Sequence, residues 1–261
     1  MSEPITNLIY TTFGYDINWF KIILLLLNSV EKCVDIKTFD FLIICDDNMF
    51  EIIHQYIKTN CNYSFNIKLH NSKKNSTTPM LASINKLGIF DFEEINNYSK
   101  ILFIDGDIIS TLNLNNLFNH ELRDDILYVY KEVEEIDAHR KILWSLENYT
   151  EDEIELFREK SIYPFNCGIF LFKNTDILKL DFDKINEIIL NHQGKFFYEQ
   201  SFMNYYFNRK GTVNYEIITN DNYIMFPDLS VKYTDKIIHF CGAGNKNKFE
   251  TIMNYLNTHS L

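Results

Sequence analysis

The chain has 261 residues and a formal net charge of −11. This length suits one α/β domain with a full core, and it is short for two ordinary domains joined by a linker. An acidic chain lacks the basic surface that binding to nucleic acid requires, so this class of partner is excluded. We therefore expect a single domain over residues 1–261. Because the chain is acidic, an anionic ligand would need a local positive charge, such as a metal ion, in order to bind.

Five cysteines are widely separated, and none forms a Cys-x-x-Cys pair. We expect free thiols, with neither a disulfide framework nor a zinc site. The apolar run at residues 22–27 is far shorter than the ~20 residues that span a bilayer, and no basic segment precedes it. These features predict a cytoplasmic protein without membrane insertion. The abundance of Asn, Ile, Lys, Phe and Tyr indicates an AT-rich genome such as that of a giant virus, which would place the protein in the virion or the host cytoplasm.

The first half of the chain alternates apolar strands with amphipathic helices. Strands are predicted at residues 8–12, 39–45, 66–69 and 101–104, and helices at residues 16–30, 49–58 and 80–90. Strands that alternate with helices indicate a mostly parallel sheet with helices on its faces.

The second half opens with an acidic stretch at about residues 121–160, which we expect to be a helical insertion with a solvated face. A strand at residues 165–172, helices at 183–192 and 198–209, and short strands at 215–218 and 236–240 follow. No internal repeat or low-complexity linker divides the chain, which agrees with a single domain.

Two carboxylates, Asp105 and Asp107, flank Gly106 directly after the apolar residues 101–104. Ligands of open α/β sheets collect beyond the carboxyl ends of such strands. A divalent cation held by one or two carboxylates keeps positions open for phosphate oxygens, so the pair suits an enzyme that binds a diphosphate through a metal. Asp-Gly is also a common turn dipeptide, and a plain turn remains an alternative for this segment alone.

Four segments in a fixed order are more specific than any one of them. They are Asp105-Gly106-Asp107, Phe165-Asn166-Cys167-Gly168, Glu199-Gln200 with Asn204, and His239-Phe240-Cys241-Gly242. This series resembles glycosyltransferase family 8, which includes glycogenin and the lipopolysaccharide galactosyltransferases and shows Asp-x-Asp, Phe-Asn-Ser-Gly, Asp-Gln and His-Phe-x-Gly followed by Lys. The resemblance covers about residues 6–250 and implies a GT-A fold: one Rossmann-like domain whose mostly parallel sheet is flanked by helices.

The resemblance implies a metal site formed by Asp105, Asp107 and His239. Two carboxylates and an imidazole suit Mn²⁺, with Mg²⁺ as the other candidate, and a nucleotide diphosphate would complete the octahedral shell. A cation there would stabilise the charge that builds on the β-phosphate as the bond to the sugar breaks. Considered alone, His239 lies in an apolar segment and would be interpreted as a core histidine.

The resemblance also implies contacts with a UDP-sugar donor. The residues concerned are Thr11, Thr12, Tyr15, Lys86, Asp105, Gly106, Asp107, Asn166, Cys167, Gly242 and Lys246. Thr11, Thr12 and Tyr15 would hold the uracil and ribose, where an aromatic ring can stack on the base. Asn166 would contact the donor sugar, next to Cys167 in place of the family's Ser.

Two lysines carry further predictions from the resemblance. Lys246, which we prefer over Lys248, would contact the phosphates, and Lys86 would lie at the donor site. For each of them the alternative is an ordinary solvated surface charge.

The predicted catalytic residues are Glu199, Gln200 and Lys86. Glu199 replaces the family's Asp, so its carboxylate reaches one methylene further toward the anomeric carbon. We expect a retaining transfer with front-face attack by the acceptor, in which Glu199 positions the donor and forms no covalent bond. UDP-glucose is the first expected donor, ahead of UDP-galactose and UDP-N-acetylglucosamine, and a protein or glycan is the expected acceptor. Self-glycosylation and a homodimer remain open.

Two other functions compete with this prediction. A phosphatase of the haloacid dehalogenase type also places Asp-x-Asp after an apolar strand, but about a hundred residues of α/β pattern precede Asp105 here and the His239 segment would have no role. A protein that binds a nucleotide-sugar without turnover is the second alternative, because Cys167 and Glu199 both depart from the family pattern.

Overall fold

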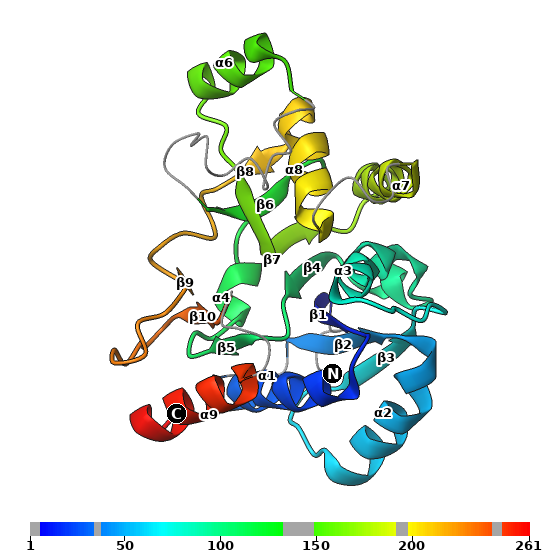
Figure 1. Cartoon of the computed structure of the whole chain (residues 1–261), viewed down its shortest axis with the longest axis vertical. Helices are drawn as coiled ribbons and strands as arrows, with labels where there is room; N and C mark the ends of the chain where they lie inside the picture. The colour runs from blue at the N-terminus through cyan, green and yellow to red at the C-terminus, as the bar shows by residue number, and fades with distance from the viewer. Residues whose placement is uncertain (1–5, 34–37, 133–148, 192–197, 242–246) are drawn as a thin grey trace.

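The computed structural model describes residues 6–33, 38–132, 149–191, 198–241 and 247–261. Its larger sheet has seven strands in the order β3-β2-β1-β4-β7-β6-β8 (Figure 1). The strands are β1 (Asn7–Phe13), β2 (Phe39–Cys45), β3 (Ile67–Asn71), β4 (Lys100–Ile104), β6 (Leu127–Lys131), β7 (Phe165–Lys173) and β8 (Val213–Asn214). The pairs among β3, β2, β1 and β4 are parallel, while β7 runs antiparallel to both β4 and β6. The predicted mostly parallel central sheet is therefore confirmed.

A smaller sheet lies beside the carboxyl end of β4 and positions part of the site. It has the order β5-β10-β9, with β5 (Ile108–Ser110), β9 (Tyr223–Met225) and β10 (Ile237–His239). β10 pairs antiparallel with β5 and parallel with β9. Because β5 follows β4 after only three residues, this sheet brings the C-terminal part of the chain next to the end of β4.

Helices cover both faces of the larger sheet (Figure 1). They are α1 (Phe20–Cys33), α2 (Asp47–Asn60), α3 (Pro79–Ser83), α4 (Asn115–Phe118), α6 (Glu151–Glu159), α7 (Asp176–Asn191), α8 (Tyr198–Lys210) and α9 (Lys248–His259), with 3-10 helices η1 (Ile17–Trp19), η2 (Ile84–Asp91) and η3 (Ile95–Asn97). Alternate residues of each strand enter opposite cores: Ile9 packs in the cluster that contains α1, and Tyr10 in the cluster that contains α7. Every residue of β2 is buried, as continuous apolar strands in such sheets predict.

The helical insertion predicted for residues 121–160 is wrong in its first part. Residues Leu127–Lys131 form β6, because Leu127, Tyr128 and Val129 are buried between β7 and β8 rather than on a solvated helix. Residues 133–148 lie outside the described part of the chain. The last part is helical as predicted, since α6 begins with a capping box between Thr150 and Glu153.

Other boundaries also differ from the prediction. The strand expected at residues 215–218 is wrong, because these residues follow the two-residue strand β8 (Val213–Asn214) and are not in a strand themselves; the helix expected from residue 183 begins at Asp176. β5, β9 and α9 have no counterpart among the predicted elements. Among the helices described, none combines the length and apolar character needed to cross a bilayer.

Candidate functional site

Asp105 and Asp107 lie at the carboxyl end of β4, where the chain turns into β5. The Asp105 N–H donates to the Gly168 carbonyl of β7 at 2.7 Å, and the Ile108 N–H donates back to the Asp105 carbonyl at 3.2 Å. The two interpretations of Asp-Gly-Asp are thus compatible, because the segment is a turn and also presents two carboxylates at the end of a buried strand.

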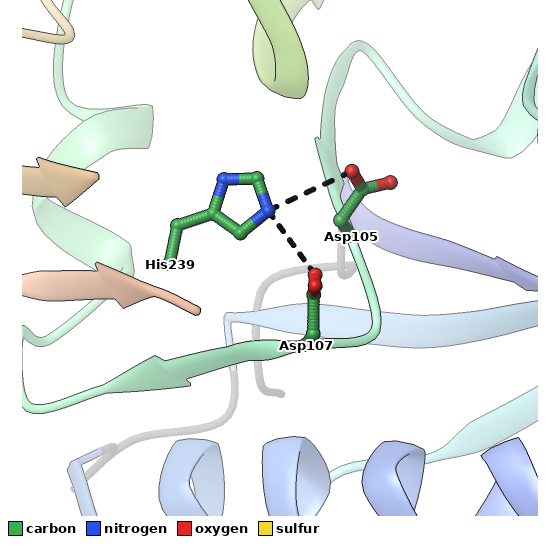
Figure 2. A group of neighbouring side chains, drawn as sticks. All are labelled: Asp105, Asp107 and His239. Carbon is green, nitrogen blue, oxygen red and sulfur yellow. Dashed lines mark ion pairs between the residues drawn. The ribbon is translucent and has the colours of Figure 1, made fainter. Parts of the chain in front are cut away.

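His239 reaches these carboxylates because β10 pairs with β5. In that register His239 lies opposite Ile108, and the Phe240 N–H donates to the Asp107 carbonyl at 3.1 Å. The His239 Nε2 lies 3.1 Å from Asp107 Oδ1 and 3.9 Å from Asp105 Oδ2 (Figure 2). One potential ligand atom from each of the three residues lies within 4.8 Å of the other two. The structure therefore brings together the three residues predicted to hold a metal.

Gly168 makes room for the imidazole. A Cβ at this position would lie 2.3 Å from His239 Cε1 and 2.7 Å from Asn166 Oδ1. Real Cβ atoms do not approach other atoms this closely, and both neighbours are held by other contacts. Gly168 is therefore required by the packing around His239, as close backbone approach at glycine predicts.

Lys248, the first residue of α9, is buried and pairs with Asp107. Its ammonium contacts Asp107 Oδ2 and lies 5.2 Å above the Trp19 ring. Burial raises the pKa of Asp107, but the His239 and Lys248 contacts outweigh it and hold this pKa well below its usual range. Lys246 and Gly242, the two donor contacts predicted in this region, lie outside the described residues.

Lys86 lies in η2 and is 2% exposed, so the surface-lysine alternative is wrong for this residue. Its Nζ lies 2.5 Å from Glu199 Oε1 and 3.3 Å from Asp105 Oδ1, and it donates to the Cys167 carbonyl at 3.1 Å. Burial alone would lower the pKa of Lys86, but Asp105 and Glu199 raise it above its ordinary value. The lysine thus links the candidate metal ligand Asp105 to the predicted catalytic acid Glu199.

Glu199 and Asp105 are carboxylates whose negative charges are compensated less completely than that of Asp107. Glu199 is 4% exposed, and its Oε2 is buried with no hydrogen-bond partner among the described residues. Burial, with the neighbouring Asp107 carboxylate adding to it, raises the pKa of Asp105. A buried carboxylate oxygen without a donor is costly, and such groups occur where a ligand completes the hydrogen bonding.

Cys167 is joined to Gln200 and Glu132 by a series of hydrogen bonds. The Cys167 N–H donates to Gln200 Oε1 at 3.0 Å, and Gln200 Nε2 donates to Glu132 Oε2 at 3.2 Å. Burial raises the pKa of the Cys167 thiol well above its usual value, so the thiol is no nucleophile. Cys167 contributes its backbone N–H and carbonyl to the site, which a serine would do equally well.

A cavity of about 180 Å³ extends from the carboxylates to the loop after β1. Thr12, Tyr15 and Gly106 line it together with Asp105 and Asp107. Tyr15 is 45% exposed and has a φ of 72°, which is unusual for an aromatic residue.

Thr11, unlike Thr12, has no exposed side-chain surface. Its hydroxyl has no partner among the described residues. Thr11 therefore presents no exposed atom to a donor.

Asp46, which the sequence motifs did not single out, holds the far wall of this cavity. It has no exposed surface and accepts hydrogen bonds from the Tyr15 N–H at 3.0 Å, the Ser76 N–H at 2.9 Å, the Ser76 hydroxyl at 3.0 Å and Asn85 Nδ2 at 2.8 Å. A Cβ on Gly14 would lie 2.6 Å from Asp46 Oδ2. The available signal was its place directly after the buried strand at residues 39–45.

Comparisons with known proteins identify a family for this chain. The model of "Glycosyl transferase family 8" matches residues 10–247. Galactinol synthase 2 of Solanum lycopersicum is 27% identical over 198 residues, which are 68% of this chain and 52% of that protein. The chain thus spans about half the length of this curated relative.

Similar solved structures support the fold. The galactosyltransferase LgtC, solved with donor and acceptor sugar analogs, gives a TM-score of 0.64 at 14% identity and covers 96% of this chain and 95% of its own. GlyE of Streptococcus pneumoniae gives 0.58 at 13%, covering 96% and 60%, and mouse xyloside xylosyltransferase 1 gives 0.56 at 10%, covering 93% and 98%. The expected GT-A fold is confirmed. The chain belongs to glycosyltransferase family 8, as its series of motifs predicts.

Proposed function

We propose that this glycosyltransferase uses Mn²⁺ to transfer a hexose, with retention of configuration, from a UDP-sugar to a glycan or protein acceptor. The observation that carries the proposal is the cluster of Asp105, Asp107 and His239 next to the Lys86–Glu199 ion pair, at one end of a cavity. The cluster can hold a cation, and the ion pair can hold the reacting sugar beside it.

The donor set fits a divalent cation of the Mn²⁺ or Mg²⁺ type. Two carboxylates and one imidazole nitrogen converge, and an octahedral ion bound by three protein ligands keeps positions open for phosphate oxygens. The Lys248 ammonium on Asp107 supports this fit, because it shows that the carboxylate pair attracts positive charge. The bound ion would supply Lewis-acid stabilisation of the diphosphate leaving group.

The cavity supports a place for the nucleotide. Tyr15 is 45% exposed and lines the same cavity as Thr12 and the two carboxylates. Stacking of uracil on Tyr15 would leave the diphosphate next to Asp105 and Asp107. Gly106 would allow the diphosphate to approach the backbone between the two carboxylates.

Glu199 is suited to orient the donor sugar and not to attack it. One carboxylate oxygen is engaged by Lys86 at 2.5 Å, which lowers its nucleophilicity, while Oε2 remains available for a sugar hydroxyl. Gln200 is held by the Cys167 N–H and can contact the same sugar face. These contacts favour a mechanism in which Glu199 and Gln200 orient the reactants and the acceptor attacks the donor sugar from its front face.

A donor panel tests this function. We expect purified protein with Mn²⁺ to release UDP from UDP-glucose or UDP-galactose in the presence of glycan acceptors, and chelation of the metal to abolish release. UDP-galactose stands beside UDP-glucose because galactose is the sugar in the description of LgtC. Intact mass spectrometry of the same samples would reveal self-glycosylation as an added hexose mass.

Three outcomes would contradict the proposal or part of it. Saturable, Mn²⁺-dependent UDP binding without transfer to any acceptor would favour a non-catalytic binding protein. Phosphate release from phosphate monoesters without UDP release would favour the phosphatase. Full transfer by Glu199→Ala, with transfer lost in Asp107→Asn, would refute only the positioning role of Glu199.

A further inference from the structure

Tyr223 of β9 connects two parts of the site that the motifs treat separately. It has no exposed surface, and its hydroxyl contacts both His239 Nδ1 and Asn166 Oδ1, the latter at 3.3 Å. β9 and β10 are parallel neighbours, so this contact comes from the small sheet that also positions His239. Tyr223 thus links a candidate metal ligand to a residue predicted to contact the donor sugar.

The orientation of the Asn166 amide is determined by the backbone. Asn166 Oδ1 accepts the Gly168 N–H at 2.8 Å, and a backbone N–H is always a donor. The amide oxygen, and not the nitrogen, must therefore face this group. The same oxygen is then available as an acceptor for the Tyr223 hydroxyl.

The imidazole of His239 can carry its proton on either nitrogen. For Nε2 to serve as a metal ligand its lone pair must be free, so the ring proton must lie on Nδ1 and needs an acceptor. The Tyr223 oxygen can accept this proton only if its own hydrogen points elsewhere, and Asn166 Oδ1 is positioned to receive it. The order is then Nδ1–H to Tyr223, and Tyr223 O–H to Asn166.

The Tyr223 hydroxyl also suits the other tautomer. His239 Nε2 lies 3.1 Å from Asp107 Oδ1, so a proton on Nε2 can be donated to that carboxylate while the Tyr223 hydroxyl donates to Nδ1. A hydroxyl rotates and serves as donor or acceptor, whereas a phenylalanine ring offers neither. Once a cation occupies Nε2, Asn166 allows the first arrangement to be as well satisfied as the second, because it accepts the Tyr223 proton.

We propose that Tyr223 is a positioning residue that, together with Asn166, holds His239 in the tautomer whose Nε2 is free to bind a divalent cation. The proposal rests on the proposed metal-dependent function. In this arrangement the side-chain oxygen of Asn166 accepts from Tyr223 and so supports the candidate metal ligand His239. Only the side-chain nitrogen of Asn166 is then left to contact the donor sugar.

The test compares Tyr223→Phe with Tyr130→Phe. The two rings pack with centroids 4.5 Å apart, but the Tyr130 hydroxyl donates to Asn220 Oδ1 at 2.7 Å, so each variant removes one hydroxyl and only the first removes a partner of His239. We expect Tyr223→Phe to weaken Mn²⁺ binding roughly 10- to 100-fold, the usual cost of losing a partner of a metal-binding histidine. Mn²⁺ binding is measured from the electron paramagnetic resonance signal of free Mn²⁺, and folding by circular dichroism. Tyr130→Phe should bind Mn²⁺ like the wild type.

A second measurement observes the His239 imidazole directly. In the Mg²⁺-loaded wild type, nitrogen NMR should show a protonated His239 Nδ1, and a solvent-protected Nδ1 proton that becomes exchangeable in Tyr223→Phe and not in Tyr130→Phe. A wild type that binds the cation with Nδ1 unprotonated, or a folded Tyr223→Phe with wild-type Mn²⁺ affinity, would overturn the role of Tyr223 and leave the proposed function standing. A wild type that binds no divalent cation, with or without UDP, would overturn both.

Discussion

Two acidic segments follow buried strands on either side of β1, and they are built differently. Asp46 follows β2 and accepts four hydrogen bonds from neutral donors, with no cation among these contacts. Asp105 and Asp107 follow β4 and contact Lys86, Lys248 and His239 instead. In the sequence the two segments look alike, since each is an apolar run that ends in acidic residues.

The difference distinguishes a structural joint, which is a carboxylate that ties fixed segments of the protein together, from the carboxylates of a binding site. Asp46 ties the Tyr15 backbone to the Ser76 loop and to Asn85, and all of these partners are fixed parts of the protein. Asp105 and Asp107 are partnered by the buried ammonium groups of Lys86 and Lys248 and by an imidazole, and a bound cation could compensate the same carboxylates. We infer that carboxylates satisfied by neutral donors hold the cavity wall, whereas those compensated by charges exchange partners with ligands.

The largest effect is expected from Asp107→Asn, which should lower kcat/KM for UDP-sugar hydrolysis or transfer roughly 100-fold or more, because a ligand of the proposed metal site is lost. Thermal stability should fall as well, because the substitution leaves the buried Lys248 ammonium without its ionic partner and removes a carboxylate whose lowered pKa stabilises the fold at neutral pH. Donor turnover and thermal unfolding measured on one preparation check this. A large loss of stability with unchanged turnover would show that Asp107 is a joint like Asp46.

Asp46→Asn should lower stability without a large loss of turnover. An amide nitrogen cannot accept from the N–H donors that surround both oxygens of Asp46, so buried donors lose their partner at a cost of about 2 kcal/mol. The melting temperature should fall by roughly 4–8 °C. The KM for the UDP-sugar should rise severalfold, because Tyr15, which lines the cavity, is held less firmly when its hydrogen bond to Asp46 is weakened. The kcat should stay within about twofold of the wild-type value.

The exposed neighbour Asp47 provides the matched control for Asp46. It accepts one hydrogen bond, from Asn71 Nδ2 at 2.7 Å, so Asp47→Asn should change neither stability nor KM appreciably. If Asp46→Asn instead lowered kcat as strongly as Asp107→Asn does, the division between joint and binding site would be lost.

The sequence alone predicts those parts of this arrangement that depend on residues close together in the chain, and it fails where the interacting residues are far apart in the chain. The strand at residues 39–45 is found with the predicted bounds, because a continuous apolar run buried on both faces is a local signal. The acidic pattern predicts a helical insertion that includes residues 127–131, because neighbouring charges obscure a strand of five residues that pairs with β7 and β8. β5 and β9, with three residues each, are too short to show a period.

The candidate site follows the same rule. Asp105, Asp107 and His239 were predicted as a group only through the resemblance, since the register between β10 and β5 that joins them is not local. Tyr223 was missed because its partners are 16 and 57 residues away in the sequence. Asp46 was missed because its donors come from three separate segments, and a strand-end acid before a helix would ordinarily cap that helix, which Asp46 does not do.

The smallest effect concerns Thr11 and Thr12 of β1, the strand that separates the two acidic segments. Successive strand residues point to opposite faces, and here Thr12 lines the cavity whereas the Thr11 hydroxyl is buried without a partner among the described residues. Thr11→Val removes an unpaired buried hydroxyl at nearly constant volume, so it should stabilise the protein by about 0.5 kcal/mol with an unchanged KM for the UDP-sugar. Thr12→Val should leave stability unchanged and raise that KM two- to fivefold. Urea unfolding and donor titrations on the pair measure both quantities, and a KM that rises only in Thr11→Val would show that the donor depends on Thr11 and not on Thr12.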